Sequence, residues 1–289
     1  ARSLMLSSGR PRASSPVSQK GFRTSQQREE AGSNCSPWTI LSPSTLPVSS
    51  ELIYRFSMSE TPSSPLVSFV PTPIGNLADI TLRGLETLRS ADLIACEDTR
   101  HSRKLLNHYE IEKPLVSLHD HNEARRVPEI LRKASQGQHI AVISDAGTPC
   151  LSDPGHRLLR ACIKEDVNYE VLPGPSAITT ALVASGLPPL PFTFGGFLPY
   201  KKGKRERELQ AALNRGHTSL YFESPHRLVS TLEILTNLNP LVHVSITKEL
   251  TKKFENIYGG QTLKLLRTFT DRPPRGEFVL AIDPTSLSQ

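Results

Sequence analysis

The sequence predicts the α/β fold class, with two α/β domains that follow a polar N-terminal segment. From Leu66 onward, short apolar runs typical of buried strands alternate with stretches whose apolar residues recur at helical spacing. Such alternation is typical of parallel strands joined by right-handed crossover helices. The proline-rich run 187–191 interrupts the alternation, and proline cannot continue a helix. We therefore place the domains at 66–186 and 187–289.

The composition is ordinary for a globular protein. The chain has 289 residues, of which 37% are hydrophobic and 21% are charged. No apolar run approaches the roughly 18 residues that a membrane span needs, so we expect no membrane association. The formal net charge of +6 permits nucleic-acid binding without demanding it. The cysteines have neither CxxC nor metal-ligand spacing, so we expect reduced thiols in a cytosol-like compartment: Cys35, Cys96, Cys150 and Cys162.

Residues 1–65 differ from the rest of the chain. They are rich in serine and proline and show no sustained period, so we expect this segment to be disordered. Their arginine-rich and acid-poor composition is also typical of a transit peptide, which would place the protein in an organelle. The alternative is that Met58 is the true start of a compact bacterial enzyme of the cytoplasm. We favour this alternative, because Met58 lies eight residues before the first predicted strand.

In the first domain, each predicted strand is followed by a helix. The strands are the apolar runs 66–70, 93–96, 115–118, 140–143 and 169–172. The first helix is capped by Asp79 or Thr81, whose side chains can accept from free backbone N–H groups. The last helix is rich in small residues and ends at Ser185, with Gly186 as its C-cap. Inward faces are predicted at Ile80, Leu85 and Leu88, at Leu105 and Leu106, at Val127, Ile130, Leu131 and Ala134, and at Leu158, Leu159, Cys162 and Ile163.

The second domain repeats the alternation of strand and helix, from which parallel pairing follows. Strands are predicted at 192–194, 219–222, 242–246 and 277–282, with a loop at 195–200. A basic helix begins in the run 201–207. Another helix begins with Ser224 as its N-cap and Pro225 at its first position. Proline is tolerated there because the backbone N–H at the first helical position has no hydrogen-bond partner within the helix.

The loop 144–155 is the most distinctive segment of the sequence. It follows the predicted strand 140–143 and contains two glycines, two prolines and two aspartates. Ordinary strand-to-helix connections have about two to six residues, so this one is roughly twice the usual length. Ligands bind beyond the carboxyl ends of strands in open parallel sheets, and the first four strands all end in polar or Gly/Pro residues. The sequence therefore predicts a ligand-binding loop. The GxGxxG and P-loop cradles for dinucleotides and triphosphates are absent.

Several loops carry motifs that occur together in one family. The segment DAGTPCLSDPG at 145–155 resembles the signature of the ribosomal RNA small subunit methyltransferase I family, one of the tetrapyrrole-methylase-like (class III) S-adenosylmethionine-dependent enzymes. The resemblance runs in motif order from about Leu66 to the end, and residues 1–65 have no counterpart. It also covers PTPIGNLADIT at 71–81, EDTRH at 97–101, HDHNE at 119–123, PGPSA at 173–177, GFLP at 196–199, ESPHR at 223–227 and ELTK at 249–252.

This resemblance implies two α/β domains of the tetrapyrrole methylase type, with S-adenosylmethionine in the cleft between them, and a homodimer. It implies transfer of the methyl group to the ribose 2′-oxygen of a cytidine in small-subunit (16S) rRNA. The family's cofactor-binding positions map onto Ile74, Gly75, Asp145, Ala146, Gly147, Thr148, Ser176, Ala177, Phe222, Glu223, Leu250 and Glu277.

The residue types suit these roles. An ionised Asp145 can accept from a hydroxyl or ammonium group of the cofactor, although an aspartate there could also simply form the turn. The small residues let the backbone approach a ligand closely. Methyl transfer to a hydroxyl also needs a group that takes its proton, and strand ends offer Glu97, Asp98, His119, His121, Glu223 and Glu249.

Among these we favour Asp98 with Arg100 as catalytic residues, beside Glu97. Asp98 and Arg100 leave the same strand end, and Arg100 could hold a phosphate or the carboxylate. The alternative is an Asp–Arg pair that only fixes the start of the helix, and the sequence does not decide between the two.

Two further segments suggest contact with RNA. We expect His119 and His121 to point to opposite sides, without a third ligand at metal spacing, so we predict no metal site. The run 201–207 lies beside aromatic residues, as RNA-binding surfaces do, although a solvated helix start is the ordinary alternative. The predicted partner is small-subunit rRNA or the small ribosomal subunit, contacted by His119, His121, Lys201, Lys202, Lys204 and Arg205.

Two rival functions follow from the same residues. A tetrapyrrole-type, small-molecule methylase could use the same fold, but it would need no extended basic rim such as the run 201–207. A non-catalytic RNA-binding protein is a second rival, and the intact Asp145, Gly147 and Pro173-Gly174-Pro175 argue against it.

Overall fold

The computed structural model describes residues 66–271 and 274–285, so the predicted disorder of residues 1–65 lies outside the described residues. The first half of the described chain forms a parallel sheet, in the order β3-β2-β4-β1-β5. This confirms the parallel α/β pattern predicted there. The strands are β1 (Val67–Phe69), β2 (Leu93–Cys96), β3 (Leu115–Ser117), β4 (Ile140–Ile143) and β5 (Tyr169–Val171).

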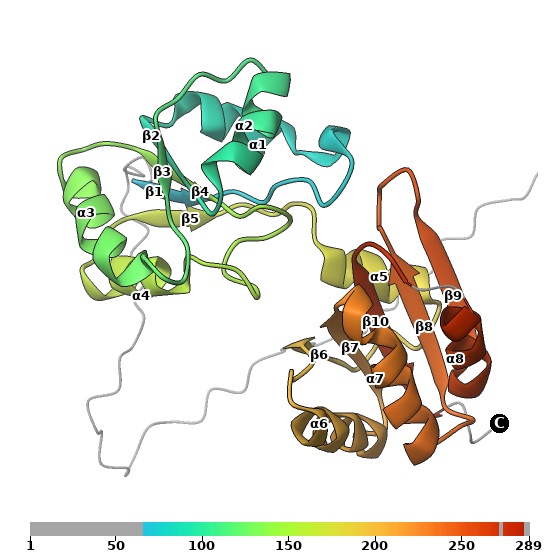
Figure 1. Cartoon of the computed structure of the whole chain (residues 1–289). Coiled ribbons are helices and arrows are strands. Elements are labelled where there is room, and N and C mark those ends of the chain that lie inside the picture. The colour runs from blue at the N-terminus through green and yellow to red at the C-terminus, as the bar shows by residue number, and fades with distance from the viewer. Residues whose placement is uncertain (1–65, 272–273, 286–289) are drawn as a thin grey trace, which may run out of the picture. The chain divides into compact units, whose positions relative to one another are not determined.

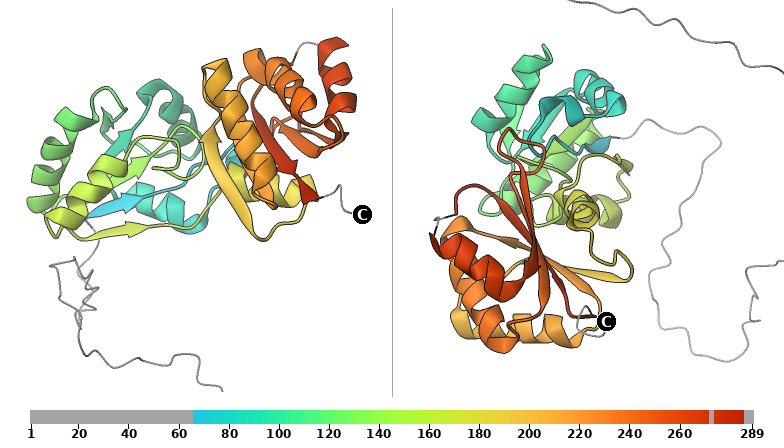
Figure 2. Two further views of the ribbon diagram at one scale, coloured as in Figure 1. Left: turned by 90° about the horizontal axis from the view of Figure 1, so that it is seen from below. Right: turned by 90° about the vertical axis from the view of Figure 1, so that its right-hand side faces the viewer.

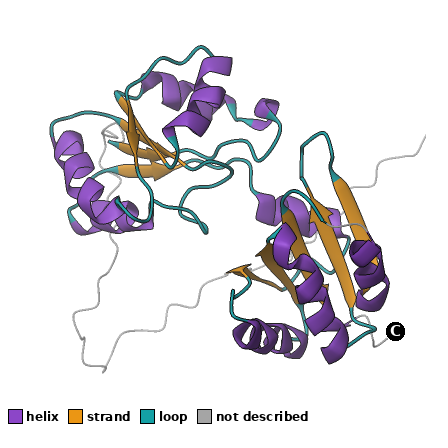
Figure 3. Cartoon of the chain, viewed as in Figure 1, coloured by secondary structure: helices purple, strands orange, loops and turns teal. Residues whose placement is uncertain are grey.

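Helices cover both faces of this first sheet (Figures 1 and 3). One face packs against α1 (Leu82–Ser90) and α2 (Thr99–His108). The other packs against α3 (Glu123–Ser135) and α4 (His156–Lys164), which contact each other. A short 3-10 helix, η1 (Leu77–Asp79), precedes α1, and Thr81 is the N-cap of α1. The inner strands β2 and β4 are buried at every residue, which explains why their sequences are continuously apolar.

The second half forms another five-stranded sheet, in the order β6-β7-β10-β8-β9. Its strands are β6 (Phe192–Phe197), β7 (Thr218–Glu223), β8 (His243–Lys248), β9 (Asn256–Gln261) and β10 (Phe278–Asp283). Only β6 and β7 pair in parallel, whereas β10 pairs antiparallel with both β7 and β8, and β8 pairs antiparallel with β9. The prediction of parallel pairing throughout the second half was therefore wrong.

The error arose because the prediction missed two elements, β9 and α8 (Thr262–Asp271). The strand β9 reads Asn-Ile-Tyr-Gly-Gly-Gln, and its two glycines hide the strand pattern. A direct β8–β9 hairpin makes their pairing antiparallel. The strand β6 is also longer than predicted. It continues through a bulge, where Gly195 packs so closely on Tyr221 that a Cβ would lie 2.3 Å from the ring.

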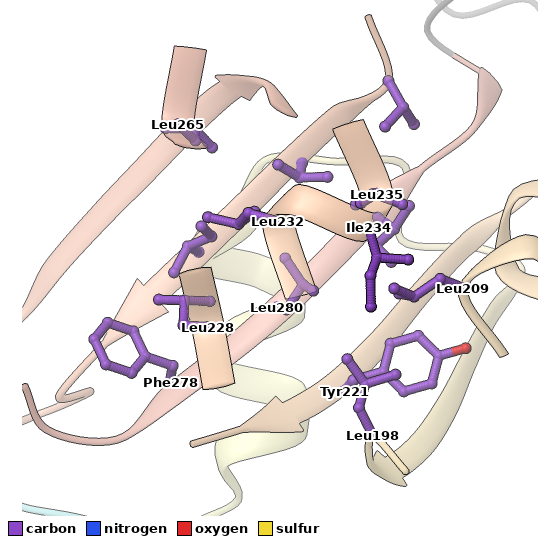
Figure 4. Close-up of a cluster of buried hydrophobic side chains, with 14 of the residues drawn as sticks. Leu198, Leu209, Tyr221, Leu228, Leu232, Ile234, Leu235, Leu265, Phe278 and Leu280 are labelled. Carbon is purple, nitrogen blue, oxygen red and sulfur yellow. The ribbon is translucent and has the colours of Figure 1, made fainter. Parts of the chain in front are cut away.

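Two apolar clusters hold the second sheet. On one face, side chains from α6 (Lys202–Asn214), α7 (Pro225–Leu238) and α8 surround Tyr221 and Leu280 (Figure 4). The helices α7 and α8 contact each other along this face (Figure 2). On the other face lies α5 (Ala177–Ser185), in a cluster with Leu220, Val279 and Ile74 of the β1 loop. The helix α5 thus packs on the second sheet, although the predicted domain boundary lies after it. That boundary stays a prediction.

Candidate functional site

A cavity of about 510 Å³ lies where the loops of the first sheet meet residues of the second. Its volume falls within the range typical of small-ligand sites, roughly 300–1,000 Å³. From the first sheet it receives the segments that follow β1, β2, β4 and β5, as predicted for ligands at the carboxyl ends of strands. The lining comprises Ile74, Glu97, Asp145–Thr148, Leu151–Asp153, Ser176–Ile178, Phe197, Phe222–Pro225, Thr247, Leu250 and Gly276–Val279.

The loop after β4 is fixed to the loop after β1. The backbones of Thr72 and Gly147 donate to each other in both directions, each over 2.9 Å, and the Thr72 hydroxyl donates to the Ser144 carbonyl over 3.1 Å. Gly147 has a φ of +82°, a left-handed conformation that explains glycine at this position. Thr148 Oγ1 donates to the Pro175 carbonyl over 3.3 Å, which joins the β5 loop to the same assembly. The backbone around Asp145 is therefore held before any ligand arrives.

Residues after β8 contact the loop after β1. The backbone N–H of Asn76 donates to Thr251 Oγ1 over 3.0 Å, and a Cβ on Gly75 would lie 2.5 Å from Lys252 Cγ. Lys252 Nζ in turn bridges Glu249 at 3.2 Å and Glu277 at 2.8 Å. Gly75 is needed for this close approach, and it lines a neighbouring cavity of about 480 Å³ that also contains Lys252.

Glu223 is the most deeply buried carboxylate of the cavity wall. Its side chain is 0% exposed and pairs with Arg227 at 2.7 Å. It also accepts from the backbone N–H of Ser224 at 2.7 Å and from the hydroxyl of Thr231 at 2.6 Å. Ser224 caps α7 and Pro225 begins it, as predicted. With these three donors engaged, Glu223 shapes the wall of the cavity.

Carboxylates dominate the charge of the cavity. Burial, and next the charge of Glu97, raise the pKa of Asp153 to about 7. Burial, and next the charge of Asp145, raise the pKa of Glu97 above its ordinary value. Among the described residues, no lysine, arginine or histidine lines this cavity. Because Arg227 and Lys252 pair with Glu223 and Glu277, the negative charge comes from the remaining carboxylates, and it favours a ligand with a positive charge.

The structure brings together eleven of the twelve predicted cofactor-binding residues in this cavity, and the remaining one, Gly75, lines its neighbour. Of the predicted catalytic residues, Glu97 lines the cavity, whereas Asp98 and Arg100 line neither cavity. The backbone N–H of Asp98 donates to Asp145 Oδ1 over 3.2 Å. The assembled residues therefore extend from the end of β2 to β10.

Asp98 has the geometry of a helix cap. Its carboxylate accepts from the Arg100 backbone N–H at 2.8 Å and pairs with the exposed Arg100 guanidinium at 3.1 Å. Hydrogen bonds from Arg100 lower the pKa of Asp98 to about 2, which makes it a weak base. This arrangement matches the alternative stated above, in which the pair fixes the start of α2. We therefore do not retain Asp98 and Arg100 as catalytic residues.

The predicted RNA-contacting residues divide into two groups. Lys201, Lys202 and Lys204, called the α6 lysines below, are exposed. Arg205 is only 4% exposed, and its guanidinium donates to Ser230 Oγ at 3.0 Å and to the carbonyls of Pro199 and Tyr200. We withdraw Arg205 from the RNA-contacting set, because its charge is engaged inside the protein.

His119 and His121 follow β3 in a turn. Their ring centroids lie 6.0 Å apart in an edge-on arrangement, so the expectation that they point to opposite sides was wrong. Strand alternation does not apply to them, because β3 ends at Ser117. Across residues 66–271 and 274–285, no three His, Cys, Asp or Glu side chains lie close enough together to hold a metal ion.

Several lining residues were not among the predicted site residues, and Leu151, Asp153, Thr247 and Phe197 are four of them. Asp153 stands in the central motif, but its partial burial beside Glu97 and Asp145 depends on loops that are distant in sequence. Phe197 was assigned to a loop, whereas it ends β6 after the bulge. The motif around Asp153 was the available signal, and for Phe197 the signals were the paired glycines and the GFLP motif at 196–199.

Comparison with known proteins identifies the family. A sequence profile described as "Tetrapyrrole (Corrin/Porphyrin) Methylases" matches residues 66–265 of the chain. The chain belongs to the tetrapyrrole methylase family. This confirms the predicted family and the predicted fold class, because the matched region covers the first sheet and β6 to β9 of the second.

Within this family, the chain is similar to curated proteins named ribosomal RNA small subunit methyltransferase I. The Escherichia coli O157:H7 protein is 46% identical, with 74% of this chain and 76% of that protein covered. The Synechocystis protein is 44% identical, with 75% and 78% covered. The Thermotoga maritima protein is 42% identical, with 74% and 96% covered. These relatives confirm the resemblance drawn from the motifs.

Solved structures with low sequence identity support the fold. The uroporphyrin-III-C-methyltransferase of Thermus thermophilus has a TM-score of 0.53 at 19% identity, with 77% of this chain and 96% of that chain covered. A diphthine synthase has a TM-score of 0.59 at 14% identity, with 75% and 88% covered. Within the described residues, each helix is too short or too polar to span a membrane.

Proposed function

We propose that this tetrapyrrole methylase family member transfers the methyl group of S-adenosylmethionine to the ribose 2′-oxygen of a cytidine in small-subunit (16S) rRNA. The curated relatives carry names that state methylation of small-subunit rRNA. The observation that carries the proposal for this chain is the cavity itself, in which the family motifs meet and carboxylates are the only charged side chains among the described lining residues.

The cavity fits the chemistry of S-adenosylmethionine. Bound there, the cofactor supplies a methyl group on a sulfonium cation, which carboxylates attract. Asp145 is placed to accept from an ammonium or hydroxyl group, beside the small residues Ala146 and Gly147. Phe222, Leu250 and Val279 offer an apolar wall on which a planar base can pack. Glu97, Ser176, Ala177 and Glu277 complete the proposed donor site.

The α6 lysines and His121, which are exposed, and the half-buried His119 form the proposed RNA-contacting surface. Phosphate neutralisation by exposed basic groups supplies affinity for RNA. The proposed partner is the small ribosomal subunit or its rRNA. We also propose a cytoplasmic homodimer with α/β domains at 66–186 and 187–289, as expected from the sequence. A tetrapyrrole acid is a poorer substrate for this cavity, since its carboxylates would meet carboxylates there.

The experiment uses labelled S-adenosylmethionine and small subunits from a strain that lacks the modification. Label in 16S rRNA at a ribose 2′-oxygen supports the proposal, and the absence of rRNA labelling refutes it. For the donor site, calorimetry compares Asp145→Ala with Asp79→Ala, which removes an exposed carboxylate of η1. Only Asp145→Ala should weaken donor binding. Undiminished affinity would place the donor elsewhere.

A further inference from the structure

Two apolar side chains that line the cavity are also open to solvent. Phe197 is 59% exposed and Leu151 is 48% exposed, although both belong to the cavity wall. Exposed apolar groups at the wall of a cavity are typical of ligand contact. The donor-site residues assigned above do not include either side chain.

Both side chains are presented by unusual backbone. Leu151 lies between Cys150 and Ser152, which have φ values of +72° and +66°. Left-handed conformations are unfavourable for residues with side chains, and they gather at sites of ligand contact. Phe197 follows the bulge of β6, and its ring lies 5.3 Å from the ring of Phe222.

The two segments that carry these side chains are neighbours. A Cβ built on Gly196, directly before Phe197, would lie 3.4 Å from Ser152 Oγ. Gly196 has a φ of +67°, so the bulge requires a glycine there. The central loop and the end of β6 therefore form one wall of the cavity, with Leu151 and Phe197 as its apolar part.

Asp153 stands beside this apolar wall. The acids that act on its carboxyl come from three loops: Glu97 after β2, Asp120 after β3 and Asp145 after β4. Ser144 hydrogen-bonds to its side chain. Burial and these three acids raise the pKa of Asp153 to about 7 although the Ser144 hydrogen bond lowers it, so near neutral pH the group can both accept and release a proton.

We propose that Leu151, Asp153 and Phe197 form the acceptor-nucleotide site, with the base packed against Phe197 and Leu151 and the ribose 2′-hydroxyl on Asp153. This inference rests on the proposed function and adds the position of the acceptor nucleotide and the group that accepts the proton of its 2′-hydroxyl. Single-stranded RNA is recognised by bases that stack on aromatic rings, and Phe197 is an exposed ring. The α6 lysines follow within seven residues of Phe197 along the chain, where they can meet the flanking phosphates.

The proposed transfer needs three groups: the ribose 2′-hydroxyl, the Asp153 carboxylate and the proposed methyl donor. The ribose O2′–H bond breaks and its proton passes to a carboxylate oxygen of Asp153. The O2′–methyl bond forms as the methyl–sulfur bond breaks, and the electron pair of that bond stays on sulfur, which becomes a neutral thioether. Asp153 then releases the proton to solvent, which a group with a pKa of about 7 does readily.

The test compares Asp153→Asn and Phe197→Ala with the unaltered full chain, using labelled donor and unmethylated small subunits. Asp153→Asn should lower the single-turnover rate about 10²- to 10⁴-fold, the usual contribution of a general base. The rate of the unaltered chain should rise with pH near 7, and Asp153→Asn should remove this rise. Phe197→Ala should raise the KM for subunits about 5- to 150-fold, as removal of one base stack does. Both variants should still bind the donor in calorimetry, with effects smaller than those on rate and KM, and retained binding also shows that they are folded.

Two further variants test the aromatic contact. Phe197→Trp keeps a ring and should retain a low KM. Phe254→Ala removes a phenylalanine that is 65% exposed but lies outside the cavity wall, so it should behave as the unaltered chain. The inference is overturned if Asp153→Asn keeps the rate and pH profile, or if Phe197→Ala chiefly weakens donor binding. If the unaltered chain labels no rRNA, the proposed function fails instead.

Discussion

Arg227 is the counter-charge of the buried Glu223, and its removal should destabilise the protein strongly. The Glu223 side chain is 0% exposed and Arg227 is 18% exposed, with 2.7 Å between the charged groups. Arg227 also donates to the Leu198 carbonyl over 3.0 Å, and Leu198 directly follows Phe197. Arg227→Ala leaves a buried carboxylate without a cation and the Leu198 carbonyl without this donor.

Breaking a buried pair by removing one partner costs about 3–5 kcal/mol. Glu223 keeps its bonds from Ser224 and Thr231, so we expect the lower end, about 3 kcal/mol. For a domain of this size that corresponds to a fall of about 6–12 °C in Tm. The measurement is urea unfolding together with a thermal melt, both on the protein without ligands.

The matched variant is the double substitution Glu223→Gln with Arg227→Met. It removes both charges and fills the space, so it should recover most of the stability. If the destabilisation arises from the uncompensated charge, the double variant is more stable than Arg227→Ala. A destabilisation below about 1 kcal/mol for Arg227→Ala, the level of a surface ion pair, would refute the reasoning.

Glycine packing, the titration of one carboxyl and the α6 lysines provide three more predictions. Gly195→Ala forces a Cβ against the Tyr221 ring and should lower the free energy of unfolding in urea by about 1–3 kcal/mol. Gly203→Ala, which has open space around it, should not destabilise the protein. Equal effects of the two substitutions would contradict the packing of Gly195 on Tyr221. The folded pKa of Asp153 is raised from 3.8 to about 7, so its contribution to stability is present below pH 3.8 and is lost as the pH rises through about 7. In urea unfolding, Asp153→Asn should therefore gain stability relative to the unaltered chain as the pH rises from 3.8 to about 7, and a constant difference would contradict the shift. Replacing the α6 lysines by alanine should reduce the slope of log K for RNA against log salt by about 0.7 for each phosphate left unneutralised, while Lys264→Ala, on the exposed side of α8, should leave the slope unchanged.

Much of the first sheet could be predicted because its strands and helix caps are specified by residues that are close together in the sequence. The strands β2 and β4 begin and end where their apolar runs do, and Thr81 and Gly186 act as the predicted caps. Those features depend on residues within a turn of each other. The second sheet was harder, because antiparallel insertion of β10 between β7 and β8 is a long-range pairing. No local pattern specifies it.

The site divides in the same way. Loop motifs located the cavity wall from Ile74 to Glu277, because the carboxyl ends of parallel strands meet at one edge. The role of single carboxylates could not be predicted. Asp98 and Asp153 are both aspartates in polar loops, yet an arginine neighbour lowers one pKa to about 2 while burial among acids raises the other to about 7. Arg205 likewise looks solvated in sequence and proves buried.

The position of β10 has a consequence for synthesis. Residues from Gly276 to Val279 line the cavity, and β10 hydrogen-bonds between β7 and β8, which precede it in the chain. A nascent chain that still lacks this segment has no strand between β7 and β8 in the second sheet, and it also lacks part of the cavity wall. Binding of the proposed methyl donor therefore needs the cavity wall that only a translated β10 segment completes.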